Sequence, residues 1–364
     1  MRVAGTLTRY FGRQFLLAVL SVFAGVIILV ALIDYIELMR RTADLADVSA
    51  LNVAKTSLYR VPQITERILP FCILVGAMSC YLNLSRRLEL VVARSSGLSA
   101  WEFIAPAVIA ALGVGVIATT IYNPVSAALR ERSKELEVEI FGGSQMGLRG
   151  PGEGFWIRQR SADRHSIINA RASSAQGVQL AGVTVFSFDE SGRFNERIDA
   201  KSATLEPGQW RLTDARIYLS GGAPVERASY SLPTNLTPIQ VRENFATAET
   251  VSFWQLPLYI ELAEHAGLGA ASYRLQYQKL LAQPFLLAGM VLLASAFSLR
   301  FFRFGGVPKM VLAGVGAGFL VYVLSKVTED LSKAELIPSM AAAWLPVLIA
   351  GLTGLVALLY QEDG

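Results

Sequence analysis

Residues Ser85 to Glu102 read Ser-Arg-Arg-Leu-Glu-Leu-Val-Val-Ala-Arg-Ser-Ser-Gly-Leu-Ser-Ala-Trp-Glu and separate two long apolar segments. Within this stretch, the residues that recur at the spacing of one helix face are Leu88, Val91, Val92 and Ser95. Glu89 and Arg94 lie off that face, so the pattern is that of a short amphipathic helix. The sequence therefore predicts a helix over residues 86–97, on the loop between the two segments.

Both ends of this loop carry helix-boundary signals. Gly97 suits the left-handed conformation that ends a helix, and Ser99 with Glu102 forms a capping box that starts the next one. The connection is therefore expected to be rigid. A rigid helix between membrane spans, with its apolar face turned away from lipid, is typical of a surface that a soluble partner binds.

The composition indicates an integral membrane protein. Hydrophobic residues make up 53% of the 364 residues and charged residues only 17%, and the mean hydropathy is positive. This is too apolar for a soluble chain of this length. The formal net charge is +4, and much of the excess comes from Arg and Lys beside apolar segments. The charge therefore indicates membrane topology, and we expect no nucleic-acid partner.

Six segments are long enough and apolar enough to cross a hydrocarbon core of about 30 Å. They are Phe15–Ile33, Ile64–Leu84, Ala100–Tyr122, Leu280–Leu299, Val307–Leu324 and Ala341–Tyr360. Three basic clusters flank these segments: Arg2, Arg9 and Arg13; Arg86, Arg87 and Arg94; and Arg300, Arg303 and Lys309. Since basic residues concentrate on the cytoplasmic side, the sequence predicts six transmembrane helices with both termini in the cytoplasm.

Prolines are expected to shape two of these spans. Pro70 is predicted to kink or delay the second span, because proline removes a helical hydrogen bond. The pair Asn123-Pro124 is predicted to end the third span on the outer side.

The region between the third and fourth spans follows a different pattern. Val183–Phe188 is strand-like, and turn signals lie at residues 189–192 and 206–209. We expect an inserted all-β extracytoplasmic domain of about six to eight strands. Phe253–His265 is predicted to be an amphipathic helix at the membrane surface, starting at the capping pair Ser252 and Gln255.

The chain is thus divided into three parts. Residues 1–130 hold spans one to three and the helix 86–97, residues 131–267 hold the β-domain and its closing helix, and residues 268–364 hold spans four to six.

The sequence carries no motif of an enzyme or a metal site. The G-x-x-x-x-G-K-[ST] phosphate loop, H-E-x-x-H and C-x-x-C are absent, and the only histidines are His165 and His265. Cys72 and Cys80 lie about 12 Å apart along one helix, too far for a disulfide. We expect no catalytic residue, no metal and no cofactor, so any work that the protein does must draw its energy from elsewhere.

Several short motifs resemble one known family. The run Glu89-Leu90-Val91-Val92, followed by Arg94-Ser95-Ser96-Gly97-Leu98-Ser99, is similar to the coupling helix of the LptF/LptG permeases, the membrane subunits of the lipopolysaccharide-export ABC transporter. Further family motifs occur in the expected order over nearly the whole chain: Arg9-Tyr10-Phe11-Gly12-Arg13, Phe141-Gly142-Gly143-Ser144, Trp210-Arg211-Leu212, Thr234-Asn235-Leu236-Thr237-Pro238, Gln283-Pro284 and Tyr322-Val323-Leu324. The coupling-helix motif and the run from Thr234 to Pro238 are closest to the LptG branch.

The resemblance implies a permease that extracts lipopolysaccharide from the inner membrane and passes it along a periplasmic β-jellyroll. The implied partners are an LptB-like ATPase dimer that binds the ATP, an LptF-like sister permease, an LptC/LptA-like periplasmic bridge protein, and lipopolysaccharide. The implied ATPase-coupling residues are Leu88, Glu89, Val91, Val92, Arg94 and Gly97. For Glu89 the alternative is a solvated carboxylate paired with Arg86.

The outer end of the first span carries Arg40 and Arg41, against the positive-inside bias. Guanidinium groups bind phosphate bidentately. The resemblance implies that both arginines face a cavity and hold lipid A phosphates, with acyl chains on Leu29 and Ile33 below them. Alternatively, the arginines snorkel to lipid head groups.

Other polar positions leave alternatives open. Relatives can carry a basic residue where this chain has Asp34 and Gln63, which indicates a different charge pattern or a differently decorated lipid A. A basic group on the far side of the third span consists of Arg130, Arg132 and Lys134. Because glutamates are interleaved with it, this group lines the cavity rim or belongs to a solvated charged helix.

In the fifth span, Gly314 and Gly318 form a small-residue face that favours packing against a partner helix.

Two other classes of function compete with transport by an ABC permease. A non-transport membrane anchor could present the periplasmic domain as a scaffold, but it needs no structured helix on the cytoplasmic side. A proton-coupled transporter is disfavoured because the spans lack an obvious inverted repeat and central acid pairs.

Overall fold

The computed structural model describes residues 2–43, 49–95, 97, 99–142, 155–161, 164–174, 178–188, 193–219, 224–234, 248–265, 270–302 and 307–362. The chain forms two compact units. The helical unit comprises Met1–Asp34, Val61–Ser126 and Ser252–Gly364, and the second unit comprises Tyr35–Arg60 and Ala127–Val251.

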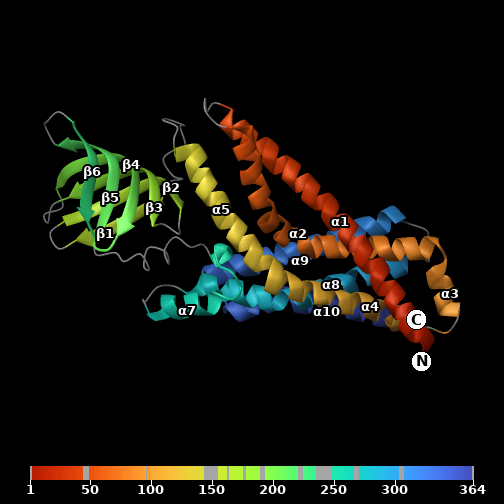
Figure 1. The fold of residues 1–364 in the computed structure, drawn as a ribbon. Helices are drawn as coiled ribbons and strands as arrows, with labels where there is room; N and C mark the ends of the chain where they lie inside the picture. The colour runs from red at the N-terminus through yellow and green to blue at the C-terminus, as the bar shows by residue number, and fades with distance from the viewer. Residues whose placement is uncertain are drawn as a thin grey trace. The chain divides into compact units, whose positions relative to one another are not determined.

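The helices follow one another along the chain as Figure 1 shows. They are α1 (Arg2–Thr42), α2 (Ala50–Arg86), α3 (Glu89–Ser95), α4 (Ala100–Ile117), the π-helical turn η1 (Ala118–Tyr122), α5 (Asn123–Gly142), the short 3₁₀ turn η3 (Ala248–Thr250), α7 (Leu256–His265), α8 (Ala271–Phe302), α9 (Val307–Lys333) and α10 (Ser339–Glu362). Six helical stretches of the described chain are long and apolar enough to cross a membrane. Five of the predicted spans lie within one of them, and the fifth span, Val307–Leu324, overlaps the stretch Val311–Lys333, so the six-span prediction is confirmed.

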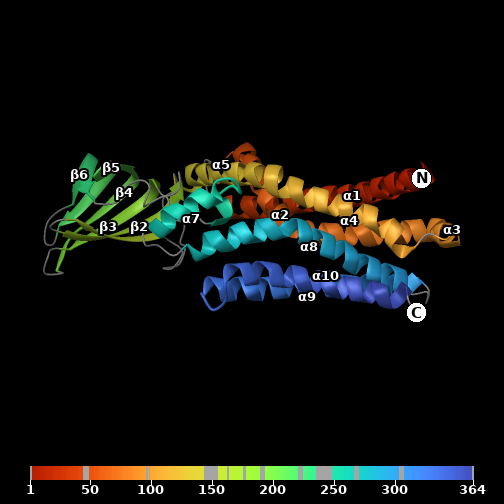
Figure 2. The same cartoon turned by 90° about the horizontal axis from the view of Figure 1, so that it is seen from below.

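The core of the helical unit lies among α1, α2, α4 and α8, with α9 and α10 packed beside α8 (Figure 2). Fully buried side chains such as Phe15, Ile73 and Phe103 fill it. In the most apolar window of each span, 61% of residues are buried in α2 and in α8, but only 6% in α1. The free thiols Cys72 and Cys80 are buried on α2.

Several helices continue beyond their predicted ends. α2 starts at Ala50 and runs through both Pro62 and Pro70, so Pro70 does not delay it. The pair Asn123-Pro124 does not end the third span either, because η1 connects α4 directly to α5. Residues 131–142, predicted as the start of the β-domain, are therefore helical.

A side chain distant in sequence explains why the chain stays helical at Pro124. Proline has no N–H to donate to the carbonyl four residues earlier, which here belongs to Thr120. The indole N–H of Trp254 donates to that carbonyl instead, at 3.1 Å. Since the carbonyl is satisfied, the helix passes the proline without a break.

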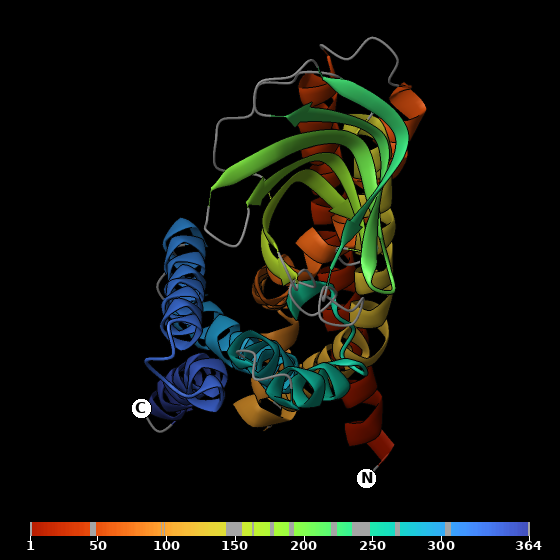
Figure 3. The same cartoon turned by 90° about the vertical axis from the view of Figure 1, so that its left-hand side faces the viewer.

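The inserted β-domain is confirmed. Its strands are β1 (Phe155–Ser161), β2 (Arg164–Ser174), β3 (Gln179–Phe188), β4 (Phe194–Glu206), β5 (Gln209–Leu219) and β6 (Val225–Pro233). They pair antiparallel in sequential order as one strongly curved sheet (Figure 3). This order is a meander, and the jellyroll name stays an inference from the resemblance.

Alternating side chains of the sheet build its core. In β3 and β4 buried and more exposed residues alternate, and Ile198, Trp210 and Leu212 are fully buried. The predicted turn between β4 and β5 contains Gly208 at φ +81°. The other predicted turn, at residues 189–192, lies outside the described residues.

Candidate coupling and substrate sites

The helix predicted over residues 86–97 is shorter, because α2 extends to Arg86 and α3 covers only Glu89–Ser95. Leu88 lies in the intervening turn at φ 60°. Leu90 and Ala93 anchor α3, with 5% and 7% of their surface exposed. The apolar residues on the outer side are exposed: Leu88 by 58%, Val91 by 49% and Val92 by 65%. The structure thus presents the predicted apolar stripe as a free surface.

The predicted ends of the α2–α4 connection are confirmed. Gly97 has φ +88°, and its N–H donates to the carbonyl of Arg94 at 3.0 Å. At the start of α4, the N–H of Ser99 donates to Glu102 Oε2 at 3.0 Å. These bonds fix the connection, although Ser96 and Leu98 lie outside the described residues.

Two side chains of α3 contact neighbouring spans. The hydroxyl of Tyr10 on α1 donates to Glu89 Oε2 at 3.0 Å, and in the described part of the chain Glu89 forms no ion pair with Arg86. The guanidinium of Arg94 lies 5.9 Å from the ring centroid of Phe103, which is buried in α4. Tyr10 and Phe103 therefore fix the orientation of α3. Arg94, which is predicted to contact the ATPase, also packs against the span α4.

At the outer end of α1, Arg40 and Arg41 share one carboxylate. Glu37 lies 3.2 Å from Arg40 Nη2 and 2.8 Å from Arg41 Nε. The arginine side chains are 78% and 46% exposed, so their remaining N–H groups can still reach a ligand. Sequence reasoning missed Glu37, although its spacing of three and four residues from the arginines was the available signal.

The apolar part of the predicted substrate surface is also accessible. Leu29 and Ile33 are 55% and 58% exposed on α1. Asp34 and Gln63 are half-buried.

The basic group on α5 belongs to an ion network. Arg130 Nη1 lies 3.1 Å and Arg60 Nε 3.6 Å from Glu137 Oε1, and the hydroxyl of Ser133 donates to the same oxygen at 3.2 Å. Arg130 is only 21% exposed and Glu137 only 28%. The low exposure of Arg130 and Glu137 does not fit the alternative of a fully solvated charged helix. Arg132, in contrast, is exposed.

The glycine face of α9 packs within this chain. A Cβ on Gly314 would lie 2.5 Å from Cε of Met78, and one on Gly318 would lie 2.6 Å from Cδ2 of Leu74. Both neighbours belong to α2. The predicted close packing of a helix on this face is therefore confirmed at these two positions, and the helix that packs there is α2 of the same chain.

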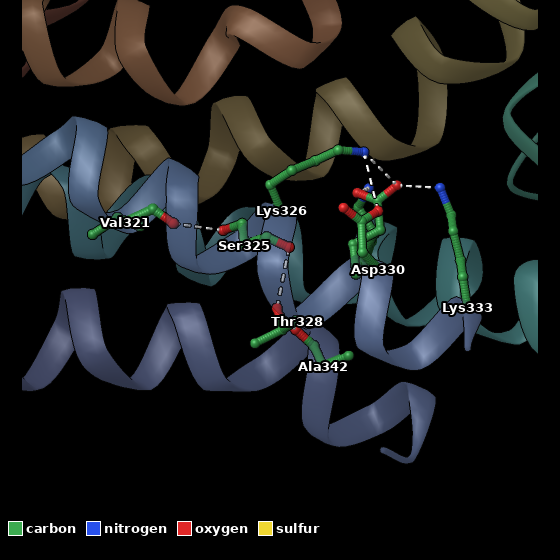
Figure 4. A network of polar contacts seen from close by, with 9 residues as sticks. Val321, Ser325, Lys326, Thr328, Asp330, Lys333 and Ala342 are labelled. Carbon is green, nitrogen blue, oxygen red and sulfur yellow. Dashed lines mark hydrogen bonds and ion pairs between the residues drawn. The ribbon is translucent and has the colours of Figure 1, made fainter. Parts of the chain in front are cut away.

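A charged cluster at the end of α9 was missed by the sequence analysis. Glu329 lies 2.8 Å from Lys279 of α8 and 2.6 Å from Lys333, and Lys326 is 3.5 Å from both Glu329 and Asp330. Figure 4 shows Lys326 and Lys333 directed at the carboxylates between them. The hydroxyl of Thr328 donates to a carbonyl of α10 at 3.0 Å, so the cluster connects α9 to both of its neighbours.

These sites belong to a chain with clear relatives. It is 23% identical over 353 residues to the lipopolysaccharide export system permease protein LptG of Escherichia coli strain K12, with 95% of this chain and 96% of that protein covered. It is also 23% identical over 350 residues to the protein of that name from Haemophilus influenzae strain Rd, with 94% and 95% covered. A sequence model described as lipopolysaccharide export system permease LptF/LptG matches residues 9–360. Since the match spans nearly the whole chain, the protein belongs to the LptF/LptG family of transport permeases.

Proposed function

We propose that this chain is a permease subunit of an ABC transporter that extracts lipopolysaccharide from the inner membrane and passes it to a periplasmic β-jellyroll bridge. A separate, LptB-like ATPase dimer binds and hydrolyses the ATP, so this chain carries no cofactor. An LptF-like sister permease completes the membrane part. The observation that carries the proposal is α3, a short capped helix between two spans with a solvent-exposed apolar stripe.

The geometry of α3 supports its role as the ATPase contact. Leu88, Val91 and Val92 are exposed although they lie on a connection held at both ends. Burying three such side chains in a groove contributes about 1.5–3 kcal/mol each when burial is complete. The carboxylate of Glu89 accepts one hydrogen bond from Tyr10 and has further lone pairs for a basic residue of the ATPase.

In this proposal α3 and both termini lie in the cytoplasm, and the sheet lies in the periplasm. Arg86, Arg87 and Arg94 around α3 support the cytoplasmic placement by the positive-inside rule. Arg40 and Arg41 then lie at the periplasmic end of α1. There they are proposed to hold lipid A phosphates, with acyl chains against Leu29 and Ile33.

Co-purification with an untagged ATPase subunit tests the proposed docking. We expect tagged wild-type chain to retain the ATPase, and the variant Val91→Asp/Val92→Asp to lose it, because two carboxylates cannot enter an apolar groove unpaired. Val225→Asp is the matched control, since Val225 is 43% exposed on β6, far from α3 in the chain. Equal retention by all three proteins would contradict docking on α3.

The same experiment separates transport from the alternative of a membrane anchor. An anchor that only presents a periplasmic domain predicts that no ATPase is retained by the wild-type chain.

A further inference from the structure

The π-helical turn η1 (Ala118–Tyr122) is held by hydrogen bonds to three other segments. The hydroxyl of Thr119 donates to the carbonyl of Leu280 on α8 at 3.0 Å, and the carbonyl of Thr120 accepts from Trp254 at 3.1 Å. The hydroxyls of Tyr122 and Thr65 are 2.7 Å apart. π-Helical turns are rare and concentrate at functional sites, and this one is fixed on each side.

Asn123 follows η1 and joins two of those segments through one side chain. Its amide nitrogen donates to Glu66 Oε1 on α2 at 2.8 Å. Its amide oxygen accepts from the backbone N–H of Phe253 at 2.9 Å. Because Asn123 is only 2% exposed, neither contact can be replaced by bulk water. The two contacts require opposite ends of the amide, so they also fix its orientation.

Asn123 and its two partners, Glu66 and Phe253, lie near points where the chain passes from one compact unit to the other. The chain passes between the two compact units after residues 34, 60, 126 and 251. Glu66 lies a few residues after the second passage, Asn123 lies just before the third, and Phe253 is the second residue after the fourth. One buried side chain within the helical unit therefore connects the segments that lead to three of the four passages. The ring of Phe253 also stacks on Tyr277 of α8, with ring centroids 5.6 Å apart.

We propose that Asn123 is a positioning residue for transport, which makes α2, the η1–α5 segment and the turn before α7 move as one body. The inference rests on the proposed function, because it assigns this joint to the transmission of ATPase-driven helix movement towards the β-domain. Without the joint, ATP hydrolysis continues while lipopolysaccharide transfer falls.

A reciprocal exchange tests the joint at the level of its atoms. Asn123→Asp keeps the oxygen that accepts from Phe253. It replaces the amide N–H that donates to Glu66 with a carboxylate oxygen, so that two carboxylates face each other. Adding Glu66→Gln restores the pair in reverse, because the amide of the new glutamine can donate to the new aspartate. Asn123→Leu/Glu66→Gln is the matched control, since leucine offers no acceptor and the second substitution cannot rescue it.

Two measurements are made on each variant in the assembled transporter. The first is lipopolysaccharide transferred to a periplasmic acceptor per ATP hydrolysed. We expect Asn123→Asp to lower this ratio about five- to tenfold, the equivalent of one buried hydrogen bond. The exchanged pair Asn123→Asp/Glu66→Gln should return to within about twofold of wild type, and the leucine double variant should stay low.

The second measurement needs no transport. Spin labels at Val125 and Leu258, which are 51% and 56% exposed, should give a narrow distance distribution in wild type and in the exchanged pair, and a broad one in Asn123→Asp. A wild type that transfers nothing but shows this distance pattern would contradict the proposed function and leave the joint supported. Unchanged distances in Asn123→Asp, or hydrolysis, transfer and melting temperature falling together, would overturn the proposal for Asn123.

Discussion

At the scale of single residues, Glu89 is either a contact for the ATPase or only a surface carboxylate, and these two interpretations predict different results. Its structural partner is the hydroxyl of Tyr10, an exposed contact, and losing such a bond costs about 0.5–1.5 kcal/mol. Tyr10→Phe should therefore leave lipid-stimulated ATP hydrolysis by the purified complex nearly unchanged. Glu89→Lys reverses the charge offered to the ATPase and should reduce complex assembly or hydrolysis while the chain still inserts and folds. Unchanged hydrolysis in Glu89→Lys would show that Glu89 is only a surface charge.

Arg40 and Arg41 are predicted to bind phosphate, and their ion pairs with Glu37 provide a second way to test this prediction. Each charge-assisted contact contributes about 1.5–3 kcal/mol, so Arg40→Glu/Arg41→Glu should strongly weaken retention and export of lipopolysaccharide. Glu37→Gln frees both guanidinium groups from their internal partner and should strengthen retention. Photocrosslinkers at positions 33, 40 and 41 measure the contact directly.

Snorkelling to head groups predicts a different pattern for the same variants. Export should then be nearly normal in the double reversal, Glu37→Gln should have no effect, and none of the three positions should crosslink to lipopolysaccharide. That result would assign both arginines to the membrane surface.

At the scale of elements, the close approach of α9 to α2 depends on Gly318. A methyl group there would lie 2.6 Å from Cδ2 of Leu74, which is fully buried. Gly318→Ala should therefore lower the free energy of unfolding by about 1–3 kcal/mol. Gly316→Ala is the control, because nothing lies within 4 Å of its Cβ position and alanine is the better helix former. Melting curves in detergent that show equal shifts for both variants would contradict the packing described for α9.

The charged cluster at the end of α9 gives a second prediction at this scale. Glu329 is 11% exposed and faces Lys279, Lys326 and Lys333, which are 39%, 52% and 43% exposed. Glu329→Gln removes the charge that these ammonium groups share. After allowance for the exposed lysines, we expect a loss of about 1–3 kcal/mol in unfolding free energy. Asp330→Asn, at a 61% exposed carboxylate, should change the melting temperature little. If the two variants melt alike, the cluster does not stabilise the α8–α9 contact.

At this scale, the sequence predicts features that depend on neighbouring residues and misses those that depend on residues far apart in the chain. Long apolar runs and local boundary signals, such as Gly97 and the Ser99–Glu102 pair, act within a few residues, and these predictions are confirmed. Asn123-Pro124 misled because its compensation comes from Trp254, 134 positions away from the Thr120 carbonyl. Glu89 pairs with Tyr10 79 positions away, a contact that no local spacing indicates.

At the scale of the whole molecule, the proposed function requires the chain to link a cytoplasmic ATPase to a periplasmic path for the lipid. The six spans, the inserted sheet and the family membership are shown. The exposed stripe of α3, the arginines on α1 and the joint at Asn123 are then three parts of one proposed path, from ATP hydrolysis to the movement of lipid. Each part is located in the described chain by its own contacts.

The most direct measurement of this account is ATP-dependent lipopolysaccharide transfer by the complex reconstituted in proteoliposomes. The complex contains this chain, its sister permease and the ATPase, and an added periplasmic bridge protein serves as acceptor. The account predicts transfer that requires ATP and is lost with Val91→Asp/Val92→Asp, but is retained with Val225→Asp. Transfer that continues without ATP, or that is unaffected by the two aspartates on α3, would contradict the central claim that α3 links this permease to its ATPase.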